Sequence, residues 1–244
     1  FLLGDATAAA AAANPEQQFA IIDVGYEEAI PNVLTLNFST AEPSFLAGYL
    51  AAGMTTTGKV ATYGGINIPP VTIFMDGFAN GVSYYNEQKS ANIEVLGWDV
   101  EAQDGSFAGN FENLDDGKAL ASSFADEGAD IIFPVAGPVG LGSSAYAAEN
   151  EGIRIIGVDN DLTVSNPNEA GVYLTSVLKK IDEAVYAAAE KVIVNGEAGG
   201  AYIGTLENDG VGLAPYHEQE GDVPQELKDE IEALKAEIIA GNVA

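Results

Sequence analysis

Acidic residues stand where parallel strands are predicted to end, which makes them candidates for binding the hydroxyl groups of a ligand. Asp23 follows Ile21 and Ile22 near the end of a predicted strand, Asp99 and Asp159 each follow a predicted strand, and Asp161 lies two residues beyond Asp159. In an open parallel sheet, ligands bind beyond the carboxyl ends of the strands. An ionised carboxylate only accepts hydrogen bonds, so it suits a ligand that carries neighbouring hydroxyls. A single aspartate at a strand end is also a common turn former, which is the structural alternative for each of these residues.

Two aromatic residues near these aspartates could stack on a flat ring. Trp98 directly precedes Asp99, and Phe133 lies in the strand predicted at 130–135. Together with the carboxylates, they predict a cleft that hydrogen-bonds hydroxyls and stacks a ring. The alternative for Phe133 is a place in the hydrophobic core.

A glycine-rich segment, VAGPVGLGSSA at 135–145, follows a predicted strand and precedes a predicted helix. Such a loop can present backbone N–H groups to a ligand. The spacing of Gly140 and Gly142, with Asp159 further on, imitates a dinucleotide-binding turn. Val135 stands where the tight-turn glycine is expected, so we interpret the segment as a ligand loop and keep an NAD(P)-dependent oxidoreductase as the alternative.

The composition excludes several kinds of chemistry. The 244 residues include no cysteine and one histidine, His217, which excludes disulfides, thiolate catalysis and cysteine-containing zinc sites. Asp and Glu number 37 against 9 Lys and Arg, a formal net charge of −28. This acidity argues against nucleic acid as a partner, because binding phosphates requires cationic side chains. No apolar run approaches the roughly 18 residues of a membrane span, so we expect no embedded segment. From the residue types as a whole, we expect no metal, no cofactor and no nucleic acid as a partner.

Apolar runs of strand length alternate with helix-length segments, which predicts an α/β fold with right-handed crossovers. Most runs are continuous rather than alternating, as expected for parallel strands covered on both faces. The predicted strands lie at 19–24, 33–38, 59–63, 93–98, 130–135, 153–158, 172–175 and 201–206. The predicted helices lie at 4–13, 44–54, 71–87, 115–127, 140–151, 176–195 and 224–240.

The order of these elements predicts two lobes. Residues 59–159 form consecutive strand-helix units, enough for one doubly wound lobe. We expect an N-terminal lobe from 1–38 plus 170–195, and a second lobe with the hinge crossings from 39–169 plus 196–244. The chain begins with a phenylalanine on a strand end or loop, so we expect it to start inside the first lobe, with upstream strand-helix units missing. A chain that crosses between lobes predicts a hinge and a ligand cleft.

Eight segments carry a family resemblance: EPSFLAG (42–48), TGKV (57–60), YGGINIP (63–69), GADIIF (128–133), VAGPVGLG (135–142), IGVDND (156–161), LTSVLKK (174–180) and DGVGLAP (209–215). They resemble the basic membrane protein family of surface lipoproteins, the purine nucleoside-binding receptors of ABC transporters. The resemblance implies a type I periplasmic-binding-protein fold with two doubly wound lobes, and it implies an incomplete first lobe here. It covers nearly the whole chain in the order of the family.

The resemblance also implies roles for individual residues. Phe133 resembles the aromatic residue that stacks on the base, and Gly137 and Pro138 match the loop beside the ribose. Pro138 departs from the glycine that is usual in the family, and proline lacks an N–H donor. Asp159 resembles the carboxylate that accepts from the ribose hydroxyls, with Asp161 as the alternative.

Three further residues complete the predicted site. Lys179 resembles the lysine of the cleft, Asn67 stands where an aspartate is common, and Trp98 is a possible second wall. The implied function is binding without catalysis: a solute-binding receptor of an ABC importer that delivers a nucleoside to a permease. The implied location is extracytoplasmic, at the cell membrane, through a lipid anchor outside these residues. A binding protein for another hydroxylated ligand such as a sugar would also fit the sequence, as would a regulator with a sensor domain of this fold.

Overall fold

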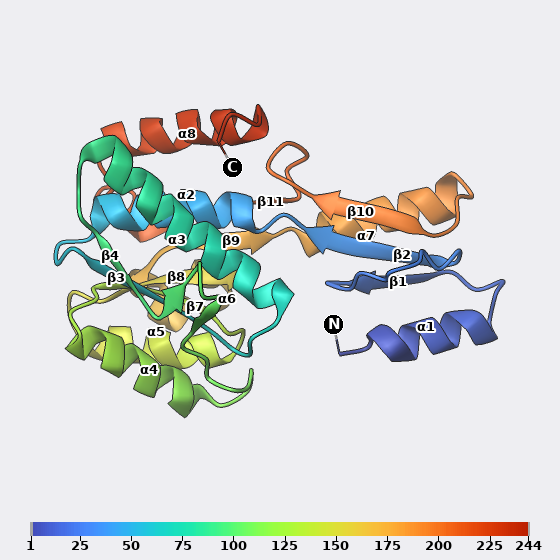
Figure 1. Cartoon of the computed structure of the whole chain (residues 1–244), viewed down its shortest axis with the longest axis horizontal. Helices are drawn as coiled ribbons and strands as arrows, with labels where there is room; N and C mark the ends of the chain where they lie inside the picture. Colours follow the sequence, from blue (N-terminus) through green and yellow to red (C-terminus); the bar gives the residue numbers. More distant parts are fainter. Residues whose placement is uncertain (1, 244) are drawn as a thin grey trace. The chain divides into compact units, whose positions relative to one another are not determined.

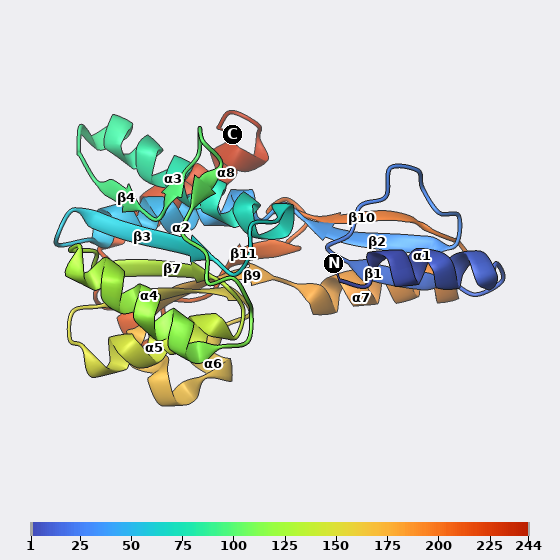
Figure 2. The same ribbon diagram turned by 60° about the horizontal axis from the view of Figure 1, so that its bottom comes forward.

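The computed structural model describes residues 2–243 and divides the chain into two units. The smaller unit comprises the chain up to Ser39 together with Lys179–Val211, and the larger unit comprises Thr40–Leu178 together with the chain from Gly212 onward. The chain therefore passes from one unit to the other three times. Figures 1 and 2 label the helices and strands of both units.

The smaller unit is built on a three-stranded parallel sheet in the order β1-β2-β10. Buried Ala11, Ile21 and Val33 form its apolar cluster. The side-chain amide of Asn32 donates to the carbonyl oxygens of Ala11, Asn14 and Gln17 at 3.1, 3.1 and 2.8 Å, which ties the end of the first helix to the sheet. The elements are α1 (Gly4–Ala13), β1 (Phe19–Ile22), β2 (Val33–Phe38), α7 (Ile181–Ala189), the π-helical turn η2 (Glu190–Val194) and β10 (Gly200–Gly204).

The larger unit is built on a six-stranded sheet in the order β11-β9-β8-β7-β3-β4. Helices α2, α3 and α8 cover one face, and α4 and α5 cover the other (Figures 1 and 2). The strands are β3 (Lys59–Gly64), β4 (Glu94–Leu96), β7 (Ile131–Val135), β8 (Arg154–Asp159), β9 (Tyr173–Lys179) and β11 (Val211–Leu213). The helices are α2 (Ala41–Met54), α3 (Pro69–Lys89), α4 (Leu114–Asp126), α5 (Val139–Glu149), α6 (Leu162–Ser165) and α8 (Gln225–Ile239). Short elements are the hairpin of β5 (Trp98–Asp99) with β6 (Asp104–Gly105) and the 3₁₀ turns η1 (Pro167–Val172) and η3 (His217–Gln219).

The strands of the larger sheet are apolar on both faces because helices cover both. All five residues of β7 are buried, and β3 pairs in parallel with β4 and β7, β7 with β8, and β8 with β9. The predicted α/β fold with parallel sheets is therefore confirmed, and each predicted strand is present close to its predicted range.

The segment after Val172 differs from the sequence expectation. The sequence predicts a helix over 176–195, but Ser176–Lys179 continues β9 and the helix begins at Ile181. The reason is pairing: Ser176 lies opposite Gly157 of β8, in the middle of the sheet. The sequence boundaries assign 170–195 to the first lobe, whereas β9 belongs to the larger sheet.

The segment that contains β10 also differs from the sequence expectation, but here the structure assigns a predicted second-lobe strand to the smaller unit. The sequence boundaries place residues 196–244 in the second lobe, but β10 pairs in parallel with β2 of the smaller sheet. The chain enters the larger unit again only at Gly212. The sequence of an apolar strand does not identify the strand with which it pairs. Its assignment to a sheet therefore cannot be read from local sequence.

Glycines allow α2 and α3 to pack with their backbones in contact. A Cβ atom at Gly48 would lie 2.0 Å from the carbonyl oxygen of Phe78, and one at Gly81 would lie 2.0 Å from that of Phe45. Cβ atoms do not occupy such positions, so any larger residue would separate the helices.

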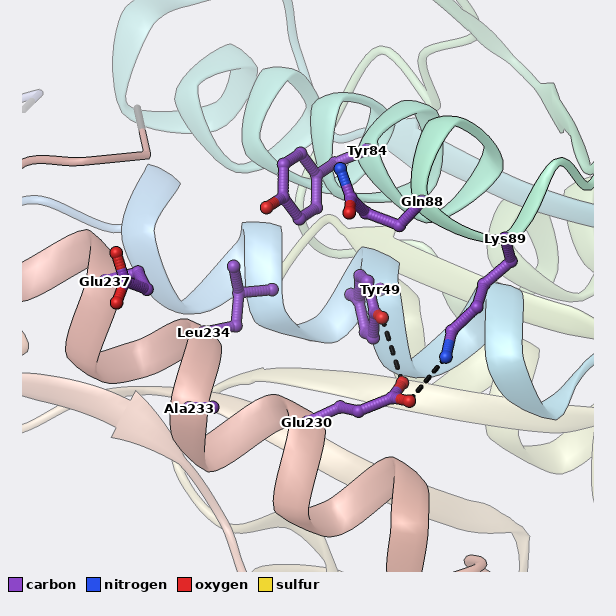
Figure 3. A pocket seen from close by; sticks show the side chains of 8 residues that line it. All are labelled: Tyr49, Tyr84, Gln88, Lys89, Glu230, Ala233, Leu234 and Glu237. Carbon is purple, nitrogen blue, oxygen red and sulfur yellow. Dashed lines mark hydrogen bonds and ion pairs between the residues drawn. The ribbon is translucent and has the colours of Figure 1, made fainter.

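Helix α8 closes the same face by a polar contact to both helices. Glu230 accepts a hydrogen bond from the Tyr49 hydroxyl at 2.9 Å and from the Lys89 ammonium (Figure 3). Leu227, Ile231 and Leu234 of α8 are buried. These contacts border a groove of about 320 Å³ lined by Tyr49, Tyr84, Gln88, Lys89, Glu230, Ala233, Leu234 and Glu237.

The pKa values follow from these contacts. The hydrogen bond from Lys89, followed by that from Tyr49, lowers the pKa of Glu230 below its usual 4.5. The same bond to Glu230 raises the pKa of Lys89. Burial, followed by the bond to Glu230, raises the pKa of the Tyr49 hydroxyl. Glu230 therefore stays ionised in the folded protein at a pH where it would be protonated in the unfolded chain.

We expect Gly48→Ala to destabilise the protein, because the added methyl group collides with backbone rather than with a flexible side chain. Overpacking of this kind costs about 1–3 kcal/mol. Urea unfolding followed by circular dichroism measures the change. Gly221→Ala is the control, since a Cβ there meets nothing within 4 Å. Equal unfolding free energies for the two variants would contradict the close packing.

We expect Glu230→Gln to lower the melting temperature at pH 7 by roughly 2–5 °C, since hydrogen bonds to a charged group are stronger than those to a neutral one. A lowered folded pKa contributes stability above the unfolded pKa, and this contribution is lost as the pH falls through the folded value. The difference between wild type and variant should therefore shrink as the pH falls below about 4.5. Glu232→Gln, on an exposed position of the same helix, is the control, and a difference that is constant with pH would refute the assignment.

Candidate functional site

A pocket of about 290 Å³ lies in the larger unit, where β7 and β8 end and their loops lead into α5 and α6. It is lined by Pro134, Gly137, Pro138, Gly140, Leu141, Val158, Asp159, Asn160, Leu162, Ser165 and Asn166. Three of the predicted ligand-binding residues, Gly137, Pro138 and Asp159, lie together in this lining. The pocket stands at the carboxyl edge of a parallel sheet, where α/β proteins bind ligands.

The loop between β7 and α5 forms one wall, and its backbone is already hydrogen-bonded. Gly137 has φ of +52°, a left-handed conformation that favours glycine. The N–H groups of Val139, Gly140 and Leu141 donate to the carbonyl oxygens of the residues three positions earlier, at 3.2, 2.9 and 3.0 Å. These three N–H groups are therefore not offered to a ligand, and Pro138 has no N–H to offer.

The glycine spacing that imitated a dinucleotide-binding turn has a packing role. Gly140 and Gly142 lie inside α5 rather than in the turn before it. A Cβ at Gly142 would lie 1.8 Å from the carbonyl oxygen of Leu114, and one at Gly117 would lie 1.9 Å from that of Val139. Gly142 and Gly117 thus let α4 and α5 pack closely, which gives Gly142 a packing role without a phosphate ligand, whereas a Cβ at Gly140 would meet Pro134 of β7, at 3.3 Å.

Asp159 projects from the other strand of the pocket. It is the last residue of β8, lies opposite Leu178 of β9 and is partly buried. Its φ of +70° is in the left-handed region, which few residues other than glycine adopt. Such strained positions cluster at functional sites, so this observation favours a binding role for Asp159.

Two asparagines of the lining were missed by the sequence analysis. The Ser165 hydroxyl donates to Asn160 Oδ1 at 2.5 Å, and Asn166 Nδ2 donates to the Tyr173 hydroxyl and to Glu169 Oε2 at 2.7 and 2.8 Å. No motif marks these residues, because they enter the pocket through irregular segments next to Asp159 and after Asp161.

Asp161, the alternative carboxylate, forms hydrogen bonds to other residues of the protein and does not line the pocket. Its Oδ1 accepts from the Thr163 N–H at 3.1 Å and caps α6, and its Oδ2 lies 2.7 Å from Nε2 of His217. Asp161 therefore joins the start of α6 to η3.

The predicted aromatic residues of the larger unit lie outside the pocket. Phe133 is fully buried, and its ring packs against Phe78 and Phe74 of α3 at centroid distances of 5.1 and 6.4 Å. It is therefore a core residue in this structure, and no face of its ring is open to a base. Trp98 is 7% exposed and donates its indole N–H to Asp76 at 2.9 Å.

Asn67 and Asp99 have local roles. Asn67 is exposed, and its amide lies 3.5 Å from the carbonyl oxygen of Gln103. Asp99 accepts from the N–H groups of Glu101 and Ala102 at 2.9 Å each, which is the turn-forming alternative for a strand-end aspartate.

Lys179 and Asp23 meet in the smaller unit. The Lys179 ammonium lies 2.5 Å from Asp23 Oδ2 and 5.8 Å from the centre of the Phe38 ring. The Lys179 side chain is only 7% exposed. Asp23 has φ of +57°. The predicted lysine and the first strand-end aspartate thus form a largely buried ion pair.

Residues 2–243 contain neither a membrane-spanning helix nor a cluster of metal-binding side chains. None of their helices is both long and apolar enough to cross a membrane. Within the same range, His, Asp and Glu form no group of three that could hold a metal ion.

Comparisons with known proteins agree with this fold. Basic membrane protein D of Borreliella burgdorferi is 34% identical over 219 residues, covering 87% of this chain and 60% of that protein. The ABC transporter nucleoside-binding protein BmpA of Lactococcus lactis subsp. cremoris is 30% identical over 257 residues, covering 100% and 68%. A crystal structure of an ABC transporter solute-binding protein from Aeropyrum pernix K1 superposes with a TM-score of 0.85 at 25% identity, covering 99% of this chain and 74% of that one.

The chain thus spans 60% to 68% of the length of these two curated relatives. A family model described as ABC transporter substrate-binding protein, PnrA-like, matches residues 1–243. Proteins described in this way bind the substrates of ABC transporters. Family model, relatives and fold together lead to one conclusion: the chain belongs to the PnrA-like (Bmp) family of ABC transporter substrate-binding proteins.

Proposed function

We propose that this protein is the receptor of an ABC importer and that it binds a nucleoside, with the ribose in the pocket of the larger unit. The observation that carries the proposal is the pocket lining, in which Gly137, Pro138 and Asp159 lie together. The resemblance found in the sequence implies that these residues contact the ribose. The relative from Lactococcus lactis is named as a nucleoside-binding protein, which supports the ligand class.

Asp159 would accept hydrogen bonds from the 2′- and 3′-hydroxyls of the ribose. Each hydrogen bond to a charged group contributes about 1.5–3 kcal/mol, and the contributions do not add fully. A nucleoside without one hydroxyl would leave part of a desolvated carboxylate unsatisfied, so the site would discriminate against deoxy analogues.

The base would pack against apolar side chains instead of Phe133. Pro138, Leu141, Val158 and Leu162 supply apolar surface in the same lining, and a flat ring buries surface well against such groups. The stacking role of Phe133 is not part of the proposal, because its ring is enclosed by α3. Lys179, Trp98 and Asn67 stay predictions without a place in this pocket.

The wider role follows from the family. A substrate-binding protein of an ABC transporter delivers its ligand to a permease, and the proposal includes that partner and an extracytoplasmic location with a lipid anchor outside these residues. A cleft that closes between two lobes stays a prediction.

We expect Asp159→Asn to weaken nucleoside binding by roughly 2–4 kcal/mol, because an amide offers one acceptor oxygen without charge in place of two charged ones. Isothermal titration calorimetry with inosine, guanosine and adenosine measures the loss. The preference for ribonucleosides over 2′-deoxynucleosides should narrow at the same time.

Asp99→Asn is the matched control, since Asp99 also ends a strand but serves its own turn. Its affinity should equal that of wild type. An unchanged affinity of Asp159→Asn, or a loss that accompanies unfolding without ligand, would return Asp159 to a structural role.

We expect the wild-type protein to bind a nucleoside and not NADH, because Gly140 and Gly142, which suggested a dinucleotide, lie inside α5 rather than in the turn before it. The same calorimeter, with NADH and free ribose as further ligands, tests the class. Tight binding of NADH without any nucleoside would refute the proposed function, and tight binding of free ribose alone would favour a sugar receptor.

A further inference from the structure

Asn166 is held by a directional chain of hydrogen bonds that joins the two walls of the pocket. Its amide nitrogen donates to the Tyr173 hydroxyl at 2.7 Å. That hydroxyl donates to Ser144 Oγ at 2.8 Å, and Ser144 Oγ donates to the carbonyl oxygen of Gly140 at 3.2 Å. Gly140 and Asn166 both line the pocket. The chain therefore runs from one side of the pocket to the other beneath its surface.

The direction of this chain determines which atom of Asn166 faces each partner. Ser144 donates to a carbonyl oxygen, which only accepts, so the Tyr173 hydroxyl in turn donates to Ser144 and accepts from Asn166. Glu169 supplies a second constraint, because its carboxylate accepts from the same amide nitrogen at 2.8 Å. The amide nitrogen must therefore face Tyr173 and Glu169, and a flipped amide would place oxygen against a carboxylate.

The network is rigid because most of it is buried. Tyr173 is 1% exposed, and Ser144 is fully buried. Burial raises the pKa of the Tyr173 hydroxyl, so it keeps the proton that it donates. Within residues 2–243, no group donates to Asn166 Oδ1. This oxygen is the acceptor that the side chain can offer to a ligand.

We propose that Asn166 is a specificity-determining residue of the pocket and that its Oδ1 accepts a hydrogen bond from the 5′-hydroxyl of a bound nucleoside. Tyr173 and Glu169 are positioning residues that hold its amide. The assignment rests on the proposed function, in which Asp159 takes the 2′- and 3′-hydroxyls. The 5′-hydroxyl is the remaining donor of the sugar, and Asn166 is a second fixed acceptor in the same lining.

The test compares a nucleoside with its 5′-deoxy analogue on wild type and variants by calorimetry. Asn166→Ala should weaken binding of the nucleoside about 3- to 10-fold, the range of one neutral hydrogen bond. Wild type should bind the 5′-deoxynucleoside more weakly by a similar factor, and Asn166→Ala should lower that affinity no further. Asn168→Ala, at an exposed position two residues away, should change neither affinity.

Two further variants test positioning without removing Asn166. Tyr173→Phe and Glu169→Ala each remove one acceptor of the hydrogen bonds from the Asn166 amide nitrogen. Each should therefore weaken binding of the nucleoside more than binding of its 5′-deoxy analogue. A merely structural role would lower both affinities equally. Glu169 is only partly buried, so its variant serves if Tyr173→Phe fails to fold.

Several results would overturn the inference. They are an unchanged affinity of Asn166→Ala, an equal loss for both ligands, and a loss that disappears with the 2′- or 3′-deoxynucleoside instead. If wild type binds no nucleoside at all, the proposed function fails and the inference fails with it. That outcome is distinct from a wild type that binds nucleosides while the Asn166 variants bind them equally well.

Discussion

The parallel pairing of β7 with β8 is the interaction on which the pocket depends. Ile131 and Ile132 lie opposite Arg154 and Ile155, so the loops that follow Val135 and Asp159 emerge side by side at one edge of the sheet. The two walls of the pocket are these loops and the helices that they begin. Since helices cover both faces of the sheet, its carboxyl edge is the place where polar groups can meet a ligand.

Some residues around this edge let the helices pack closely, and others line the pocket. Gly117 and Gly142 bring α4 against α5 on one face of the sheet, as Gly48 and Gly81 bring α2 against α3 on the other. The close packing positions the start of α5. Beneath the pocket, Tyr173 and Ser144 connect this helix to Asn166 by hydrogen bonds. The same buried tyrosine therefore contributes to the core and orients an amide at the pocket surface.

The sequence predicts the positions of the strands better than the pairing between them. Continuous apolar runs identified β7 and β8, because strands covered on both faces show that pattern. The same pattern could not show that β9 joins the larger sheet or that β10 joins β2, since pairing is decided by contacts distant in the chain. Asp159, Gly137 and Pro138 were identified by their positions at strand ends and by resemblance.

Side-chain direction limited the prediction of the site. Side chains alternate between the two faces of β7, and Phe133 lies on the face covered by α3. The sequence alone does not show whether that face is open to a ligand. Asn160 and Asn166 follow no periodic pattern, so their place in the lining became visible only in three dimensions. The glycine spacing at 140 and 142 was ambiguous because close helix packing and phosphate binding both require a missing side chain.

Native mass spectrometry of the protein purified without added ligand tests most directly whether the natural ligand is a nucleoside. We expect a bound species whose mass after release corresponds to a nucleoside and whose fragmentation yields a free base. A released sugar without a base, or a dinucleotide, would contradict this expectation.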